Sequence, residues 1–246
     1  MIRSWTTALV DFLLPAGCVV CRSWMPGEAQ ELICSACKMR LRPPSWPRCR
    51  RCHHPLGTGR PDSADCIECR DWPDALTRAR SAVVLAPPAD DLAHALKYEG
   101  WQELGDLMSE AMVGAIRDVS ADVVVPVPTT DSRRKRRGYN QAEVLAESVA
   151  GAVGVDMVRA LSRRRGEGSQ TSLTPEQRRA NVRGVFVANA TLRAGLRGAH
   201  VLLVDDVLTT GATGGEAASV LVAAGARSVT LVTYARALPS TALRAA

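Results

Sequence analysis

The pattern of hydrophobic and polar positions changes once along the chain, just after Pro73. Before that point, apolar residues are scattered among prolines and cysteines with no long helical period. Beyond it, short apolar runs alternate with stretches in which apolar residues recur at helical spacing. The runs predict strands at 80–86, 121–127, 155–161, 184–187, 200–205 and 228–234. The helical spacing predicts helices at 90–117, with a break near Gly100, and at 139–153 and 213–224.

Strands that alternate with helices predict an α/β fold, built on a mostly parallel sheet with helices on both faces. Residues 162–182 are polar and rich in Arg, Gln, Ser and Thr, which is typical of a long surface loop. We therefore expect a small N-terminal region over residues 1–72 and an α/β domain over residues 73–246.

The first residues carry an apolar stretch that Asp11 interrupts. Its larger members are spaced to form one face of a short amphipathic helix; they are Trp5, Leu9, Phe12 and Leu13. The interruption, and Pro15 after it, do not fit an export signal. No run of 18 apolar residues occurs, as a transmembrane helix would require. We expect a cytoplasmic protein with no membrane insertion.

The composition is that of a globular protein with an aliphatic core. Hydrophobic residues make up 46% of the 246 positions and charged residues 23%, whereas aromatic residues make up only 4%. The net charge is +6, and only three of the 31 basic residues are lysines. Arginine suits phosphate groups because its planar fork bonds two oxygens at once, although a GC-rich coding sequence would produce the same bias.

All eight cysteines lie in the N-terminal region, as four Cys-x-x-Cys pairs. The pairs are Cys18/Cys21, Cys34/Cys37, Cys49/Cys52 and Cys66/Cys69. Two thiolates three positions apart can bind one metal ion from a tight turn, and two such pairs complete a tetrahedron. The spacing therefore predicts two structural Zn²⁺ sites. These would supply much of the folding free energy of a segment that is too short to bury a large core.

Disulfides are the alternative for these cysteines, but they would require export of the protein. Thioredoxin-like redox chemistry needs one pair within a βαβ unit, whereas here four pairs follow one another. The spacing does not determine which pairs share a metal ion; we favour consecutive ribbons, Cys18–Cys37 and Cys49–Cys69, over an interleaved arrangement. His53 and His54 could each replace a thiolate, but with eight cysteines available we interpret them as surface residues.

The stretch 201–213 combines an apolar strand, two adjacent carboxylates and a turn of small residues that opens a helix. Open α/β sheets bind ligands at the carboxyl ends of their strands. The turn offers backbone N–H groups and hydroxyls at a helix N-terminus, which together favour a phosphate. Asp205 and Asp206 would repel a bare phosphate, but they can accept hydrogen bonds from a diol beside it. The residues of the turn are Thr209, Thr210, Gly211, Ala212 and Thr213.

This stretch resembles the phosphoribosyl-pyrophosphate signature of type I phosphoribosyltransferases, most closely that of orotate phosphoribosyltransferase. The resemblance implies that Asp205 and Asp206 are the catalytic residues and hold the ribose 2′- and 3′-hydroxyls. It implies that the turn at 209–213 holds the 5′-phosphate, and that Mg²⁺ bridges the pyrophosphate and the ribose diol.

Other segments are similar to the ComF (GntX-like) competence-protein family. They are Val125-Pro126-Val127-Pro128, 133–141, Lys97-Tyr98-Glu99-Gly100 and 170–182. In that family a zinc ribbon precedes a phosphoribosyltransferase-type domain, and some members serve DNA uptake. The resemblance therefore also implies single-stranded DNA and a DNA-uptake helicase as partners.

Two surface segments would complete the site. The backbone at Pro126, Val127 and Pro128 would line the pyrophosphate position. The loop at 162–182 would close as a lid over the substrate and exclude water, and Arg178 and Arg179 on this lid would stabilise the departing pyrophosphate.

A run of five basic residues leads into the helix that we expect to begin at Tyr139. The run consists of Arg133, Arg134, Lys135, Arg136 and Arg137. Such a run is either a solvated face or a contact to an anion, which would be pyrophosphate or a nucleic-acid backbone.

Two functions of different class stay open. The first is a Mg²⁺-dependent phosphoribosyltransferase that acts on a nitrogen acceptor. The second is a non-catalytic factor that binds single-stranded DNA and has kept the sugar-phosphate pocket. Purine-salvage enzymes carry an acid three positions after the second carboxylate, where this chain has Thr209, so the resemblance does not identify the acceptor.

Overall fold

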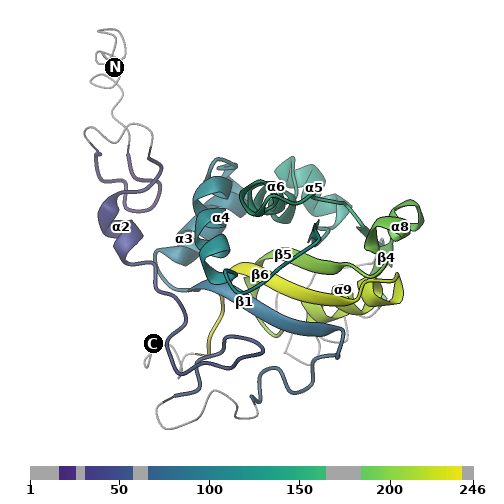
Figure 1. Ribbon diagram of the computed structural model, residues 1–246. Coiled ribbons are helices and arrows are strands. Elements are labelled where there is room, and N and C mark those ends of the chain that lie inside the picture. The colour runs from purple at the N-terminus through teal and green to yellow at the C-terminus, as the bar shows by residue number, and fades with distance from the viewer. Residues whose placement is uncertain (1–16, 26–30, 58–65, 165–183, 240–246) are drawn as a thin grey trace.

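A computed structural model describes residues 17–25, 31–57, 66–164 and 184–239. Its centre is a four-stranded sheet in the order β1-β6-β5-β2, and every neighbouring pair is parallel (Figure 1). The strands are β1 (Leu76–Val84), β2 (Val123–Pro126), β5 (His200–Leu208) and β6 (Ser228–Arg236). Their long apolar runs follow from burial on both faces, and the expected α/β class is confirmed.

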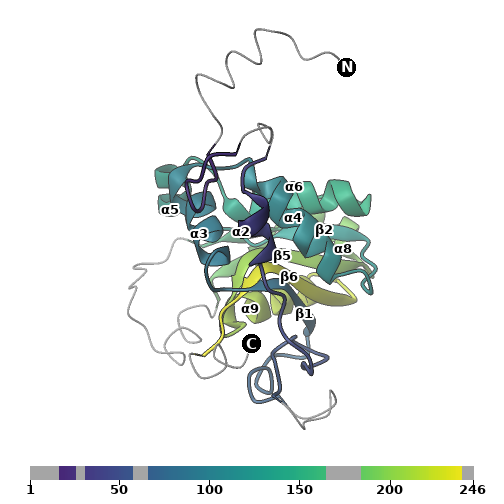
Figure 2. The ribbon, with the colours of Figure 1, turned by 90° about the vertical axis from the view of Figure 1, so that its left-hand side faces the viewer.

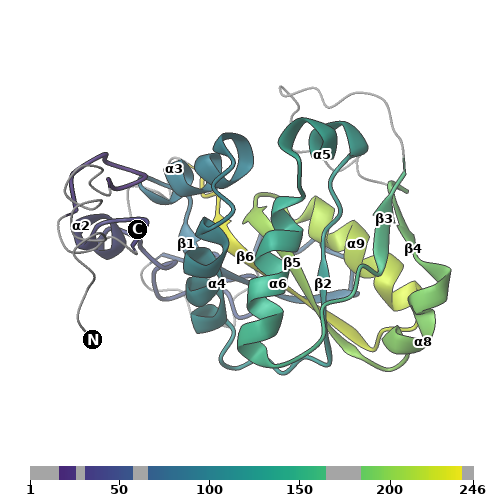
Figure 3. The ribbon, with the colours of Figure 1, turned by 90° about the horizontal axis from the view of Figure 1, so that it is seen from above.

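Helices cover both faces of the sheet (Figures 1 and 3). One face carries α3 (Ala89–His94), the π-helical turn η1 (Ala95–Glu99), α4 (Leu104–Ala115) and α6 (Gln141–Val153). The other face carries α9 (Ala212–Ala223). Side chains alternate along β5: Leu202 and Val204 join the core under α4 and α6, whereas Leu203 joins the core under α9.

A small hairpin stands beside the β2 edge of the sheet (Figure 3). It consists of β3 (Leu161–Arg163) paired antiparallel with β4 (Phe186–Ala188). A short helical segment follows, with η2 at Ala190–Leu192 and α8 at Arg193–Leu196.

The strand expected at 155–161 is wrong. This segment makes one isolated parallel bridge, between Met157 and Val124, and two backbone hydrogen bonds to Val124. It therefore pairs with β2 at one residue only. Regular strand pairing begins at Leu161, where β4 is the partner strand. Its apolar residues reflect packing against β2 and α6, which an apolar run alone does not distinguish from a strand.

The basic run also differs from expectation. Residues 131–137 form a helix of their own, α5 (Asp131–Arg137), and the following helix α6 begins at Gln141. Thr130 caps α5 by accepting a hydrogen bond from the Arg133 N–H, and Gly138 ends the helix with a left-handed conformation. Local capping thus makes a separate helix of the run that we expected to lead into a helix beginning at Tyr139.

The two cysteine ribbons pack on opposite faces of the sheet (Figures 1 and 2). The first, with α2 (Ser35–Met39), places Val19, Met25 and Ile33 in the core beside α3. The second places its cysteines and Trp72 in the core beside α9.

Several expectations fall outside the described residues. These are the amphipathic helix near the N-terminus, most of the loop at 162–182, and Arg178 and Arg179. Among the residues that the structure describes, none belongs to a helix long and apolar enough to cross a bilayer.

Leu203→Ala tests the sheet core. Leu203 is completely buried in β5, so removing its side chain leaves a cavity that costs about 2–5 kcal/mol of unfolding free energy. Urea unfolding followed by circular dichroism measures this loss. Val222→Ala on α9, where the side chain is 36% exposed, is the control and should change the unfolding free energy by less than about 1 kcal/mol. Equal effects of the two variants would contradict the assignment of the core.

Candidate functional site

The eight cysteines form two groups of four, each with all sulfur atoms within 4.8 Å of one another. The first group is Cys18, Cys21, Cys34 and Cys37, and the second is Cys49, Cys52, Cys66 and Cys69. The expected consecutive pairing is therefore the one that the fold produces.

The sulfur spacing fits a zinc ion. A tetrahedron of thiolates with Zn–S bonds of about 2.3 Å places the sulfurs about 3.8 Å apart. The Sγ atoms of Cys21 and Cys34 lie 3.7 Å apart, as do those of Cys49 and Cys69. A disulfide needs about 2.05 Å, so these pairs are not disulfides. Zn²⁺ at either site would be structural, because four thiolates leave no position open for a substrate.

Two arginines fix the second ribbon to the α/β domain. The guanidinium of Arg51, on the ribbon, donates hydrogen bonds to the Cys69 carbonyl (3.1 Å) and to the carbonyl of Leu76 in β1 (3.1 Å). Arg236 at the end of β6 is 1% exposed and donates to the Cys52 carbonyl at 2.7 Å. Hydrogen bonds from charged donors are the stronger class, so the metal-binding turns are held directly by the sheet.

The expectation that His53 and His54 are surface residues is wrong for His53. His53 is only 6% exposed, and its backbone has a φ of 57°. His54 is half-buried, with Nδ1 3.4 Å from the Arg236 guanidinium. Both rings are therefore enclosed between the ribbon and the domain.

The acidic pair lies at the carboxyl end of β5, one turn before α9. Neighbouring strand residues face opposite sides of the sheet. Asp206 is 5% exposed on the side of η1, and its backbone N–H donates to Asp205 Oδ1 at 2.9 Å. Desolvation, together with the adjacent Asp206 carboxylate, raises the pKa of Asp205.

Lys97 supplies a cation to this pair. Its Nζ lies 2.6 Å from Asp206 Oδ2, and both side chains are largely buried. Lys97 belongs to η1, whose π-helical geometry ends at Gly100 with a φ of 82°. Irregular helical turns of this kind are frequent at functional sites. The sequence marked Lys97 only as part of a family motif, and the ion pair itself was not predicted.

Arg163 on β3 belongs to the same charged environment. Burial lowers the pKa of Arg163, Arg133 lowers it further, and Asp205 raises it. The Arg163 guanidinium lies over the Phe186 ring of the same hairpin at 5.4 Å. Sequence analysis did not single out this residue, because it lies in the polar segment at 162–182 that we predicted to be a surface loop.

The turn after β5 rests on the second ribbon. Trp72 Nε1 donates a hydrogen bond to the Thr210 carbonyl at 2.9 Å. Gly211 has a φ of 80°, and a Cβ there would lie 2.4 Å from the indole ring of Trp72. Thr210 Oγ1 in turn accepts a hydrogen bond from the Ala212 N–H at the start of α9. The predicted phosphate turn is thus shaped by a residue three positions after a cysteine ligand.

The two motifs around Lys97 and Asn140 meet in space. The Tyr139 hydroxyl donates to the Leu96 carbonyl, and Arg137 lies over the Tyr98 ring at 4.8 Å. Asn140 Nδ2 donates to the Val127 carbonyl at 3.1 Å, which fixes the segment after β2. The residues Pro126, Val127 and Pro128 therefore lie at the same sheet edge as the acidic pair, since β2 and β5 are parallel neighbours.

The basic helix α5 has no buried residue. Arg134, Lys135 and Arg136 are exposed, whereas Arg133 and Arg137 are half-buried. Most of this run is therefore a solvated face, and Arg137 is the member that packs toward η1.

Sequence comparison finds two family models in series. A double zinc ribbon domain matches residues 9–70, and a phosphoribosyl transferase domain matches residues 94–244. The DNA utilization protein YhgH of Salmonella typhi is 31% identical over 225 residues, which cover 88% of this chain and 95% of that protein. Competence protein F of Haemophilus influenzae is 25% identical over 228 residues, covering 89% and 96%.

Among solved structures, the allosteric regulatory enzyme of purine biosynthesis is 22% identical, with a TM-score of 0.36. The match covers 58% of this chain and 30% of that one. A superposition this loose adds no argument about the site.

Zinc content tests the two cysteine groups. The protein should carry two zinc ions per chain, one for each group of four sulfurs. Cys21→Ser and Cys52→Ser should each lower this to one ion, and the double variant should carry none. Metal analysis by mass spectrometry on desalted protein measures the content, and mass shifts after thiol alkylation report disulfides. Intact disulfides in freshly purified protein would contradict the metal assignment.

Gly211→Ala tests the contact between Trp72 and the turn. The new methyl group would collide with the indole, and the left-handed backbone adds strain, so we expect a loss of about 2–5 kcal/mol of unfolding free energy. Gly138→Ala is the matched control, because its φ is 85° but nothing lies within 4 Å of the added methyl. It should cost only about 1–2 kcal/mol. Urea unfolding of both variants measures the difference, and equal losses would show that the indole does not constrain the turn.

Proposed function

Because the chain belongs to the ComF-like family, in which a double zinc ribbon is followed by a phosphoribosyltransferase domain, we propose that it binds phosphoribosyl pyrophosphate with Mg²⁺. The observation that carries this proposal is the ion pair of Lys97 with Asp206, beside a glycine turn that opens α9. Carboxylates, a cation and a helix N-terminus converge there at the carboxyl ends of parallel strands.

Each part of that ligand has a counterpart. The ribose hydroxyls would donate hydrogen bonds to Asp205 and Asp206. The 5′-phosphate would accept hydrogen bonds from the first-turn N–H groups of α9, which have no acceptor within the helix. The hydroxyls of Thr209, Thr210 and Thr213 would add further donors.

Lys97 and Asp206 would exchange partners on binding. A charge pair buried this closely is costly to break unless both members gain new partners. Ribose hydroxyls offer donors to Asp206, and pyrophosphate offers oxygens to Lys97, so one ligand satisfies both groups. Mg²⁺, when bound with the pyrophosphate, would neutralise part of its charge and favour its departure. The segment Pro126-Val127-Pro128 would line the pyrophosphate.

We further propose transfer of the phosphoribosyl group to a nitrogen acceptor. The acceptor nitrogen forms a bond to the anomeric carbon as the bond from that carbon to the pyrophosphate oxygen breaks. The pyrophosphate leaves with the electron pair, and the acceptor releases one proton. Thr209 provides no carboxylate base near the turn, which favours an acceptor whose proton leaves readily to solvent. Orientation and charge stabilisation would supply most of the rate.

The named relatives supply the biological context. One is called a DNA utilization protein and another a competence protein, so we propose a role in the uptake or use of DNA. The exposed basic face of α5 favours a second candidate function, binding of single-stranded DNA without group transfer.

Asp206→Asn tests the proposed site. Titration calorimetry with phosphoribosyl pyrophosphate and Mg²⁺ should show binding to the wild-type protein. Binding to the variant should be weakened about tenfold or more, because a charged hydrogen-bond acceptor is lost. Asp156→Asn is the matched control, since the Asp156 side chain is exposed and its backbone carbonyl, which the variant keeps, accepts from the Val124 N–H near the amino end of β2. Equal affinity of all three proteins would overturn the assignment.

Catalysis is measured separately. Pyrophosphate release would be followed with a panel of nucleobases and amines, in the wild-type protein and in Asp206→Asn. Release that needs an acceptor and is lost in the variant supports transfer. Tight binding of phosphoribosyl pyrophosphate with no release for any acceptor would reject transfer and leave the binding role intact.

A further inference from the structure

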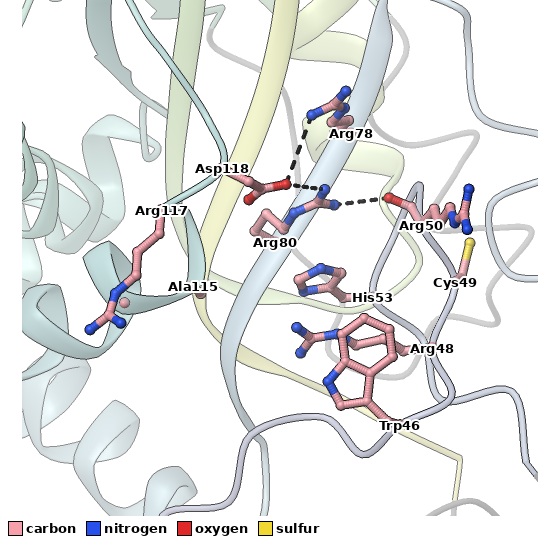
Figure 4. A pocket seen from close by; sticks show the side chains of 11 residues that line it. Trp46, Arg48, Cys49, Arg50, His53, Arg78, Arg80, Ala115, Arg117 and Asp118 are labelled. Atoms are coloured by element: carbon pink, nitrogen blue, oxygen red, sulfur yellow. Dashed lines mark hydrogen bonds and ion pairs between the residues drawn. The ribbon is translucent and has the colours of Figure 1, made fainter. Parts of the chain in front are cut away.

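A polar cavity lies away from the acidic pair, between the second ribbon, β1 and the end of α4 (Figure 4). Its volume is about 510 Å³. Five arginines line it, together with Trp46, His53 and a single carboxylate, Asp118. The arginines are Arg48, Arg50, Arg78, Arg80 and Arg117. We call this cavity the arginine cleft.

The charge balance of the arginine cleft favours an anion. Among the lining residues that the structure describes, Asp118 is the only acidic one, and it lies 3.2 Å from the Arg80 guanidinium and 3.9 Å from that of Arg78. One carboxylate cannot neutralise five guanidinium groups. A concave surface lined by positive charges raises the local concentration of anions.

Arg80 forms a rigid floor for the cleft. It is 5% exposed, and its guanidinium donates hydrogen bonds to the Arg50 carbonyl at 3.0 Å and to the Ala79 carbonyl at 3.1 Å. Long charged side chains are rarely buried unless their charge is compensated. The carbonyls carry no net charge, and the one carboxylate is shared with Arg78. The cleft therefore keeps a net positive charge, and the buried Arg80 side chain contributes to it.

Two buried polar atoms at this cleft have no partner within the part of the chain that the structure describes. They are His53 Nδ1 and Arg80 Nε. His53 is 6% exposed, and its ring lies between Arg80 and Arg48 in the wall of the cleft (Figure 4). Buried polar groups in native proteins are almost always hydrogen-bonded, and an exception calls for an ion or other group that completes the site.

Trp46 adds a surface for a planar group. Its side chain is 64% exposed, although it lies at the mouth of a polar cleft, and the Arg48 guanidinium stacks on its ring at 4.2 Å. An aromatic ring beside arginines is the combination that holds a nucleobase and its phosphate, because the base stacks while guanidinium groups bond the oxygens.

The cleft is separate from the proposed phosphoribosyl pyrophosphate site. Lys97 lies before the start of α4, whereas Ala115, at the end of α4, lines the cleft. A helix of 12 residues is about 18 Å long. One ligand of nucleotide size therefore cannot occupy both places.

We propose that the arginine cleft binds a nucleotide unit, with its phosphate on the arginines and its base against Trp46. The unit is either a free nucleotide or one member of a single-stranded oligonucleotide, since both offer the same phosphate and base. The site is independent of catalysis at Asp206.

The experiment compares two probes at one fixed ionic strength. Thymidine 5′-monophosphate is titrated by calorimetry, and a fluorescein-labelled strand of about twelve thymidines by fluorescence anisotropy. The test variant is Arg50→Ala/Arg117→Ala, because both side chains are exposed and the Arg50 carbonyl that Arg80 uses is retained. The matched control is Arg197→Ala/Arg227→Ala, just after α8 and just before β6, which removes the same charge from another exposed surface.

The test variant should weaken binding about tenfold or more, and the control less than about twofold. Trp46→Ala should weaken it about fivefold or more, through lost stacking. Binding of the monophosphate alone identifies a free nucleotide as the ligand, and binding of the strand alone identifies a nucleic acid; either result supports the proposal when the test variant reduces it. Unchanged zinc content and unchanged binding of phosphoribosyl pyrophosphate show that the variants are folded.

Three results would overturn the proposal. The first is that neither probe binds. The second is that the test and control variants reduce affinity equally, which would show a response to net charge alone. The third is that inorganic phosphate competes as well as the monophosphate while Trp46→Ala has no effect, which would show that no base is recognised.

Discussion

The contact of Trp72 with the turn at Thr210 and Gly211 joins the second cysteine ribbon to the carboxyl edge of the sheet. Gly211, with a φ of 80° and no side chain, leaves room for the indole ring. The indole N–H donates a hydrogen bond to the Thr210 carbonyl. Because Trp72 follows Cys69 closely, its position depends on the fold of the second ribbon. A small ribbon of this kind depends on metal ligation for its folding, so the shape of the turn is linked to metal binding.

Two arginines stabilise the same ribbon by donating hydrogen bonds to its backbone carbonyls. Arg51 donates to the Cys69 carbonyl and Arg236 to the Cys52 carbonyl, and both cysteines belong to the second group of four. Such bonds orient the turns that carry the sulfurs, which is a role that groups beyond the direct ligands commonly play. The second ribbon is therefore part of the wall of the α/β domain, and the first ribbon packs on the opposite face.

Electrostatics divide the domain into two regions. At the carboxyl edge, Lys97 compensates Asp206, and desolvation raises the pKa of Asp205. This edge is balanced between charges of both signs, which suits a ligand with hydroxyls and phosphates. Beside β1 and the end of α4, arginines outnumber acids, and one of them is almost completely buried. This second region is suited only to an anion.

Local patterns in the sequence determined most of the elements and the eight metal-binding cysteines, whereas the structure decided which pairs group together. The continuous apolar runs of β2, β5 and β6 fit strands that are buried on both faces of a sheet. The helical spacing of apolar residues in α6 fits a helix with one buried face. The four Cys-x-x-Cys pairs likewise carry their chemistry in their spacing. The prediction of a strand at 155–161 failed because the apolar residues of this segment pack against β2 without forming a continuous ladder of strand hydrogen bonds. The helix α5 was not predicted, because repulsion among its five basic residues disfavours a helix. Its caps at Thr130 and Gly138 stabilise the helix in spite of that repulsion.

Only the tertiary structure decided which distant residues meet. Trp72 and Thr210 are 138 positions apart, and the motifs at Lys97 and Tyr139 come together only when η1 packs beside α6. The arginine cleft draws on the ribbon, β1 and α4, none of which carries a recognisable motif for it. Spacing along the chain reports the neighbours of one helix or strand, whereas contacts between elements depend on how whole surfaces pack. That is the physical reason why the sequence predicted the ligand edge but not the residues that shape it.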